Sequence, residues 1–170
     1  MFFRVAFIAM SVFSSTHNIM GQTLDSTTQI NPFQAIIVNS NFSAAYSIWI
    51  MLTNSSLEVR YKSGLENGKD TILFSKKLLP SDTLRAISEI NINSLKQRYQ
   101  NNCIEDGSQI TIVLKKNGNT KAVHLSNYYQ EDVGKIIYLT NALLPEKFKV
   151  WYNKEKLIED LKNCKQKLKK

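Results

Sequence analysis

The chain has 170 residues, of which 43% are hydrophobic, with only 6 Gly and 3 Pro; it is sized for one folded domain and is neither collagen-like nor largely disordered. Its formal net charge is +8, but residues 153–170 hold seven Lys and three acids, whereas residues 22–152 hold fourteen basic and eleven acidic residues. A nucleic-acid-binding domain would gather its Lys and Arg on the folded body, so this distribution argues against nucleic acid as a partner.

Residues 1–21 are predicted to be a cleaved signal peptide. Arg4 supplies a positive charge, residues 5–13 form a short apolar core, and Gly21 offers a small residue at a cleavage point before Gln22. The apolar core is far shorter than the roughly 20 residues that cross a bilayer, so an uncleaved anchor is the less favoured alternative. The sequence therefore predicts an exported protein, in the periplasm or secreted.

Domain boundaries are predicted from changes in composition along the rest of the chain. Residues 22–45 begin as a polar segment and are expected to form a lead-in, in which Phe33–Val38 is either an edge strand or a cover for the core. Residues 46–152 are predicted to form a single α+β domain, because strand-like and helix-like patterns follow one another there. Residues 153–170 are predicted to form a basic C-terminal helix.

The domain is predicted to begin with a meander of three antiparallel strands. Residues 46–52 carry apolar side chains on both faces, as central strands do, and residues 57–62 alternate between apolar and charged side chains. Residues 71–76 form the third predicted strand. Ser81 then predicts the N-cap of a short helix, and residues 91–100 are expected to add another helical turn or two.

The clearest pattern is a β-hairpin over residues 109–126. Asn117-Gly118 tolerates the positive φ of a type I′ turn, and a two-residue loop pairs Lys116 with Asn119. This register predicts an apolar face made of Ile110, Ile112, Val123 and Leu125. It places on the opposite face Thr111, Val113, Ala122 and His124.

A longer helix is predicted to follow the hairpin. Residues 129–143 carry an inward apolar stripe, and Asn127 with Gln130 resembles a capping box. Residues 148–152 alternate as in a last extended segment. The predicted fold is therefore α+β, with an antiparallel sheet of about five strands in the order β-β-β-α-β-β-α, helices on one face, and a C-terminal amphipathic helix.

The C-terminal helix has a narrow apolar seam and one of the two cysteines of the chain. The seam repeats at spacings of four, three and four residues, through Leu157, Leu161, Cys164 and Leu168. Such a helix either lies on the domain or binds a partner or a membrane surface. In an exported protein, two cysteines favour a disulfide between Cys103 and Cys164, which would fix this helix to the loop before the hairpin. The alternative is that Cys164 is a small apolar seam residue.

The sequence contains no recognisable catalytic or metal-ligating constellation. His124 is the one histidine after the leader, which excludes metal sites that need two imidazoles; as a general base it would need a nucleophile and an acid from elsewhere. Turn chemistry and a helix N-terminus explain the acid pairs Glu105-Asp106 and Glu131-Asp132. Nucleotide, zinc and calcium motifs are missing, so we predict no metal, no cofactor and no enzymatic activity.

The remaining candidate is a surface of the sheet. The face opposite the hairpin core is expected to carry aromatic, Met and basic side chains, which are enriched at the centres of interfaces. The residues predicted to contact a partner are Trp49, Met51, Arg60, Lys62, Val113 and His124. The alternative is that Phe33–Val38 or the C-terminal helix covers this face.

The leader MFFRVAFIAM…MGQT and the hairpin-plus-helix layout resemble those of small exported α+β proteins of Gram-negative bacteria. That group includes periplasmic immunity proteins, which neutralise toxins delivered by neighbouring cells, so the resemblance implies an exported inhibitor with a toxin as its partner. The sequence thus predicts a non-catalytic protein-binding module. Two alternatives are a cell-envelope protein that binds an anionic surface through the Lys-rich residues 153–170, and a small hydrolase centred on His124 or Cys103.

Overall fold

A computed structural model of the chain describes residues 30–39, 46–64, 68–104 and 107–167. The predicted signal peptide and the first part of the predicted lead-in lie outside the described residues. The described elements, in chain order, are β1 Phe33–Asn39, β2 Tyr46–Thr53, β3 Ser56–Ser63, β4 Thr71–Lys77, α1 Asp82–Ser88, η1 Ile92–Ser94, β5 Arg98–Gln100, β6 Gln109–Lys116, β7 Asn119–Ser126, α2 Glu131–Asn141, η2 Glu146–Phe148 and α3 Lys154–Lys167.

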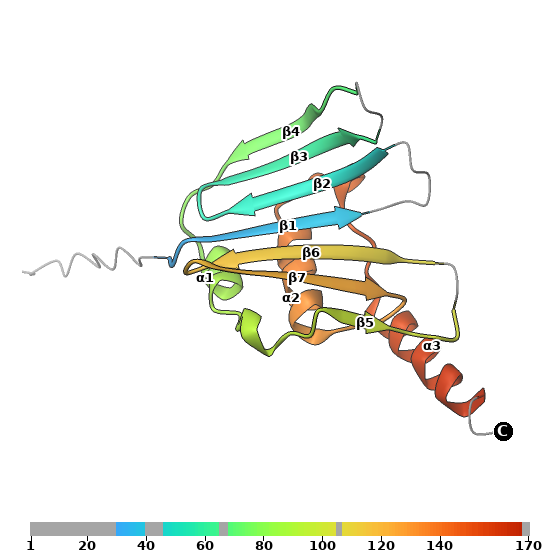
Figure 1. Ribbon diagram of the computed structural model, residues 1–170. Coiled ribbons are helices and arrows are strands. Elements are labelled where there is room, and N and C mark those ends of the chain that lie inside the picture. The colour runs from blue at the N-terminus through green and yellow to red at the C-terminus, as the bar shows by residue number, and fades with distance from the viewer. Residues whose placement is uncertain (1–29, 40–45, 65–67, 105–106, 168–170) are drawn as a thin grey trace, which may run out of the picture.

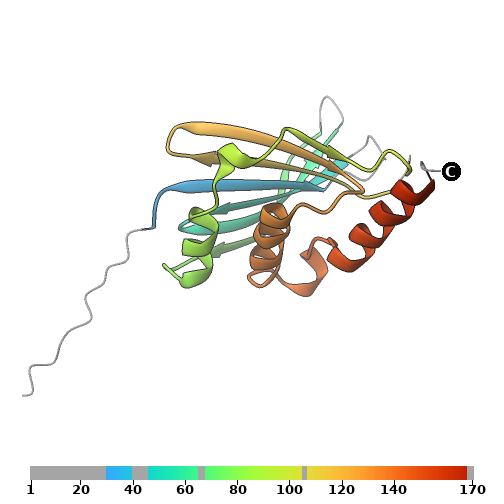
Figure 2. The same cartoon turned by 90° about the horizontal axis from the view of Figure 1, so that it is seen from below.

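The seven strands form one sheet in the order β4-β3-β2-β1-β6-β7-β5, and α1 and α2 lie together on one face of it (Figure 1, Figure 2). Neighbouring strands are antiparallel except for β5, which runs parallel to β7. The predicted α+β class is confirmed. The predicted number of strands, about five, is too low.

One additional strand is β1, which is central and not at an edge. It pairs with β2 on one side and with β6 on the other. Ala35 and Ile37 are fully buried on one face, and Ile36 is only 8% exposed on the other, as expected for a strand with neighbours on both sides. The predicted lead-in, residues 22–45, therefore contains a strand of the sheet, and the domain starts before residue 46.

The other additional strand is β5, which lies where a helical turn was expected. Residues 91–100 contain only the short η1 before the chain extends, and Arg98 then pairs with His124. A parallel pair of three residues leaves no periodicity in the sequence that could reveal it. The last extended segment expected at residues 148–152 is also not a strand. Phe148 is the last residue of η2, and the residues between η2 and α3 pair with no strand of the sheet.

The start of α2 differs from the expected one. The side chain of Gln130 caps the helix, since its Oε1 accepts the backbone N–H of Val133 at 2.7 Å. Asn127 has a positive φ of 49°, and its Oδ1 accepts the N–H of Ser108 at 2.8 Å. Asn127 therefore closes the base of the hairpin and does not form a capping box with Gln130.

The hydrophobic core lies between the sheet and helices α1 and α2. Its largest fully buried aliphatic side chains are Ile37, Ile50, Leu52, Leu57, Val59, Leu84, Ile112, Val123, Val133, Ile136 and Ile137. The predicted hairpin register is confirmed, with Ile112 opposite Val123. Asn117 and Gly118 have φ values of 51° and 78°, as a type I′ turn requires. The hairpin thus turns every second residue away from the core.

Helix α3 lies outside this core and projects from one end of the sheet (Figure 1). Its buried residues, Leu157 and Cys164, do not belong to the core cluster. The predicted disulfide is present: Cys103, between β5 and β6, is bonded to Cys164 with a Cα–Cα distance of 5.4 Å across 61 residues of sequence. None of the described helices has the length and apolar character needed to cross a membrane.

Replacing both cysteines by serine should release α3 while the core stays folded. The chain-entropy model for a loop of this length gives a loss of about 4 kcal/mol in the free energy of unfolding. Hydrogen exchange should show lost protection within Lys154–Lys167 and retained protection in β1 and β6. Unchanged protection of α3 would show that the burial of Leu157, and not the disulfide, holds the helix.

Candidate functional site

The second face of the sheet is not covered by any described helix, and we call it the open face (Figure 1, Figure 2). Cross-strand pairing aligns its side chains in two rows. The first row contains Arg60, Trp49, Val38, Thr111, His124 and Arg98. The second row contains Glu58, Met51, Ile36, Val113 and Ala122. The residues predicted to contact a partner therefore share one face, with Lys62 beside Ser47 at the end of β3.

The alternative in which another part of the chain covers this face is wrong for the two segments considered. Phe33–Val38 lies within the sheet as part of β1, and α3 lies beyond one end of the sheet (Figure 2). The open face is consequently a surface of the described fold and not a second core.

An apolar strip runs across the middle of the open face. Ile36 is only 8% exposed although no described helix lies above it, because Met51 and Val113 flank it on the neighbouring strands. Val38 lies between Trp49 and Thr111 in the same way. These cross-strand contacts make the strip continuous over three strands. Contiguous apolar surface of this kind commonly marks an interaction site.

Trp49 is held in a defined orientation within the strip. Its Nε1–H donates a hydrogen bond to Ser47 Oγ at 2.8 Å, and the Lys62 ammonium lies 5.4 Å from the centroid of its ring. Both contacts come from one cross-strand pair, Ser47 of β2 and Lys62 of β3, and the ring is half-buried. A fixed, partly exposed indole is a suitable anchor for a partner, because little side-chain entropy remains to be lost on binding.

The two predicted cations of the open face are already paired. Arg60 Nε and Nη2 donate to Glu58 Oε2 at 2.8 and 2.6 Å, and Lys62 forms an ion pair with Asp70. These pairs neutralise the positive charge beside Trp49. The apolar side chains, more than a basic field, therefore characterise this half of the face.

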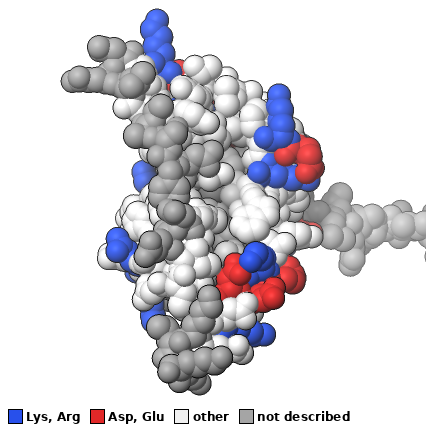
Figure 3. Space-filling view, turned by 90° about the vertical axis from the view of Figure 1, so that its right-hand side faces the viewer, with Lys and Arg blue, Asp and Glu red and all other residues white. Residues whose placement is uncertain are grey.

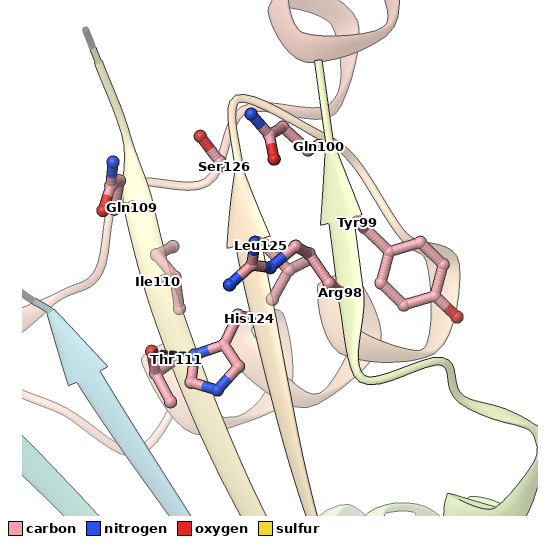
Figure 4. Close-up of a pocket in the computed structure, with 9 residues that line it drawn as sticks. All are labelled: Arg98, Tyr99, Gln100, Gln109, Ile110, Thr111, His124, Leu125 and Ser126. Carbon is pink, nitrogen blue, oxygen red and sulfur yellow. Dashed lines mark hydrogen bonds between the residues drawn. The ribbon is translucent and has the colours of Figure 1, made fainter. Parts of the chain in front are cut away.

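The face is hollowed where β5, β6 and β7 meet (Figure 4). The hollow has a volume of about 270 Å³. The side chains of Ile110 and Leu125 are buried in the core, so the backbone of these strands forms its floor. Its walls are the polar side chains of Arg98, Gln100, Gln109, Thr111, His124 and Ser126. Thr111 Oγ1 lies 3.0 Å from His124 Nδ1 and orients the imidazole ring.

The chemistry expected of a small hydrolase is only partly assembled here. His124 has a hydroxyl beside it, but the described lining of the hollow contributes no carboxylate to orient the ring. Cys103 is bonded to Cys164 and offers no thiolate. Within the described part of the chain, no three His, Cys, Asp or Glu residues are grouped as metal ligands would be.

A second concavity of about 570 Å³, lined by Tyr129, Tyr138 and Tyr152, lies between α2 and the start of α3. Burial raises the pKa of Tyr152, whose hydroxyl donates to Tyr128 O and accepts the Gln130 N–H, both at 2.9 Å. This tyrosine thereby ties the segment before α3 to the start of α2.

The cation beside that groove is also satisfied within the chain. Lys154 pairs with Glu131 at 2.9 Å and lies 5.3 Å from the centroid of the Tyr129 ring. Seen from the end of the sheet where α3 lies, acidic and basic side chains adjoin on one side of the molecule, and basic side chains without acidic neighbours lie on the other (Figure 3). The groove is therefore explained by the packing of α2 against the start of α3.

Sequence reasoning missed the residues of the open face that β1 and β5 contribute. Ile36 and Val38 were placed in a segment of undecided structure, and Arg98 and Gln100 in a helical turn. Only the alternation of polar residues at Gln109, Thr111, His124 and Ser126 was a signal for the hollow, because the hairpin register puts them on one face.

Comparisons of the chain with protein-family models, with curated proteins and with solved structures returned no match.

Two neighbouring residues of β2 test whether the open face is exposed. Ile50→Ala should lower the free energy of unfolding by about 2–5 kcal/mol, because it empties a core position that is 1% exposed. Trp49→Ala should lower it by less, about 1–2 kcal/mol, since its ring is only half-buried on an uncovered face. Urea denaturation measures both values, and an equal loss at the two positions would mean that the chain covers this face.

Proposed function

We propose that the protein is an exported, non-catalytic binding module that inhibits a protein partner by covering part of its surface, as an immunity protein does to a toxin. The observation that carries the proposal is the apolar strip from Trp49 to Val113 on a sheet face that the described helices leave open. Surface of this composition is typical of the centre of a protein–protein interface.

The shape of the strip favours a protein over a small molecule. Small ligands are held in concave pockets that surround most of their surface. The strip instead crosses neighbouring strands of a sheet, and the one hollow described on this face is lined by polar side chains. A protein surface can cover the strip as a whole, which a small ligand cannot do.

The sheet is also a rigid platform for such a contact. β1 is hydrogen-bonded on both sides, to β2 and β6, and its inner face is part of the core. A surface that is already ordered loses little conformational entropy on binding. The Cys103–Cys164 disulfide agrees with an oxidising compartment such as the periplasm, and so supports the proposed location.

Affinity capture from the native organism with the wild-type protein, followed by measurement of the dissociation constant, tests the open face. Trp49→Ala should weaken the complex by about 30-fold or more, the effect of a central interface residue. The matched control is Trp151→Ala, which removes the other tryptophan of the chain at a position that is 56% exposed after η2. Equal affinities of Trp49→Ala and the wild type would exclude this face as the binding surface.

A second variant probes the charged border of the strip. Arg60→Glu places a second carboxylate beside Glu58 and should also weaken the complex, whereas the core packing of β3 stays intact. Circular dichroism and the denaturation midpoint provide the control for folding. A complex that tolerates both Trp49→Ala and Arg60→Glu would leave the open face without a role.

The second candidate function is that of a cell-envelope protein, which would attach to the envelope through α3. The helix projects from the body, and the exposed Lys162 and Lys165 form no ion pair with a described residue. Its buried residues Leu157 and Cys164 already face the protein. Attachment would therefore depend on charge alone and not on insertion of an apolar face.

Vesicles that contain anionic lipid test this alternative. If α3 attaches the protein, Lys162→Glu with Lys165→Glu should abolish binding, and wild-type binding should fall steeply between low and physiological salt. The matched control reverses two exposed lysines of the distant β4 strand, Lys76 and Lys77. Equal binding of both double variants and the wild type would exclude α3 as the attachment site.

A further inference from the structure

The polar hollow of the open face is not explained by the apolar strip. Among the described residues that line it, Arg98 is the one with a formal charge, and the polar side chains of Gln100, Gln109, Thr111, His124 and Ser126 carry no negative charge. No carboxylate belongs to its described lining. A site with one permanent cation and several donors has the composition of an anion site.

Arg98 differs from the two cations of the open face that the sequence predicted to contact a partner. Arg60 and Lys62 each form an ion pair, whereas Arg98 forms none with a described residue and is exposed. Its guanidinium extends from β5 over β7 toward β6, into the space between Ser126 and His124 (Figure 4). The cation is thus available to an incoming group at the centre of the hollow.

The charge and shape of the lining favour a carboxylate over a phosphate. A guanidinium binds a carboxylate through two parallel hydrogen bonds, and the charges of the two groups cancel. A doubly charged phosphate would leave about one negative charge uncompensated beside a single arginine, since no second Lys or Arg belongs to the described lining. The rigid floor and the Thr111–His124 contact keep part of the site in place before binding.

The hollow and the apolar strip lie within the area of one interface. Arg98, His124, Thr111, Val38 and Trp49 are successive neighbours on five adjacent strands. At about 4.8 Å per strand, the row from Trp49 to Arg98 spans roughly 19 Å. An interface that buries about 800 Å² on each protein is wide enough to cover both.

We propose that the hollow receives the side-chain carboxylate of an Asp or Glu residue of the protein partner. The Arg98 guanidinium binds the carboxylate, and the amides and hydroxyls of the walls donate to its remaining lone pairs. This inference rests on the proposed function, because it concerns the same partner that docks on the apolar strip. It predicts that this partner carries a negative charge at one border of its contact surface.

The free protein provides the first test, with acetate as the probe. In NMR spectra at constant ionic strength, acetate should cause saturable shifts of the Arg98 side-chain N–H and the His124 ring, and acetamide should cause none. The acetate shift of the His124 ring should vanish in Arg98→Gln, and both shifts should persist in Lys115→Gln, which removes an exposed cation from the same face outside the hollow. Absent or unsaturable shifts, or tighter binding of inorganic phosphate than of acetate, would overturn the carboxylate assignment.

The complex provides the second test and separates the two proposals. Arg98→Gln should weaken partner binding by about tenfold or more, as expected for loss of a charged hydrogen-bonded pair, and Lys115→Gln by less than about threefold. Weakening by Trp49→Ala without weakening by Arg98→Gln overturns the carboxylate inference and leaves the proposed function standing. If neither variant weakens the complex, both proposals are wrong.

Discussion

Successive side chains of a strand point to opposite faces of the sheet, and helices α1 and α2 cover only one of them. This constraint determines what the rest of the molecule can do. On the covered face, residues such as Ile37 and Ile112 are fully buried and hold the sheet to the helices. On the open face, the same strands must present every second residue outward. Apolar side chains such as Trp49, Met51 and Val113 are only half-buried there, and covering their remaining apolar area with another surface is favourable.

Stability and the proposed binding function are consequently assigned to different faces of the same strands. The core cluster includes residues of α1 and α2 but none of α3, which is joined to the body through Cys103 and Cys164. The terminal helix can therefore loosen without disturbing the platform. The open face also contributes little to the core, so its residues can change to fit a partner while the fold is retained.

The sequence predicted those parts of the fold that depend on local rules. Asn117-Gly118 determines the turn and, through it, the register that buries Ile112 and exposes His124. Only part of each row of the open face could be predicted, because the hydrophobic pattern of β1 does not distinguish a central strand from an edge strand. β5 could not be predicted at all: its three residues are in a strand only because β7 offers them an edge. Arg98 was missed for that reason, since its position depends on pairing between distant segments.

The two parts of the open face have different consequences for recognition. The apolar strip attracts any surface of complementary shape, because burial of apolar area is not directional. In the proposed complex, Arg98 adds discrimination: a partner that covers the hollow without a carboxylate would remove the guanidinium from water and leave it unpaired, which costs free energy. A partner with an acid at that position avoids this cost. In this proposal the strip alone would give affinity with little selectivity, and the hollow would select one partner among many that could cover the strip.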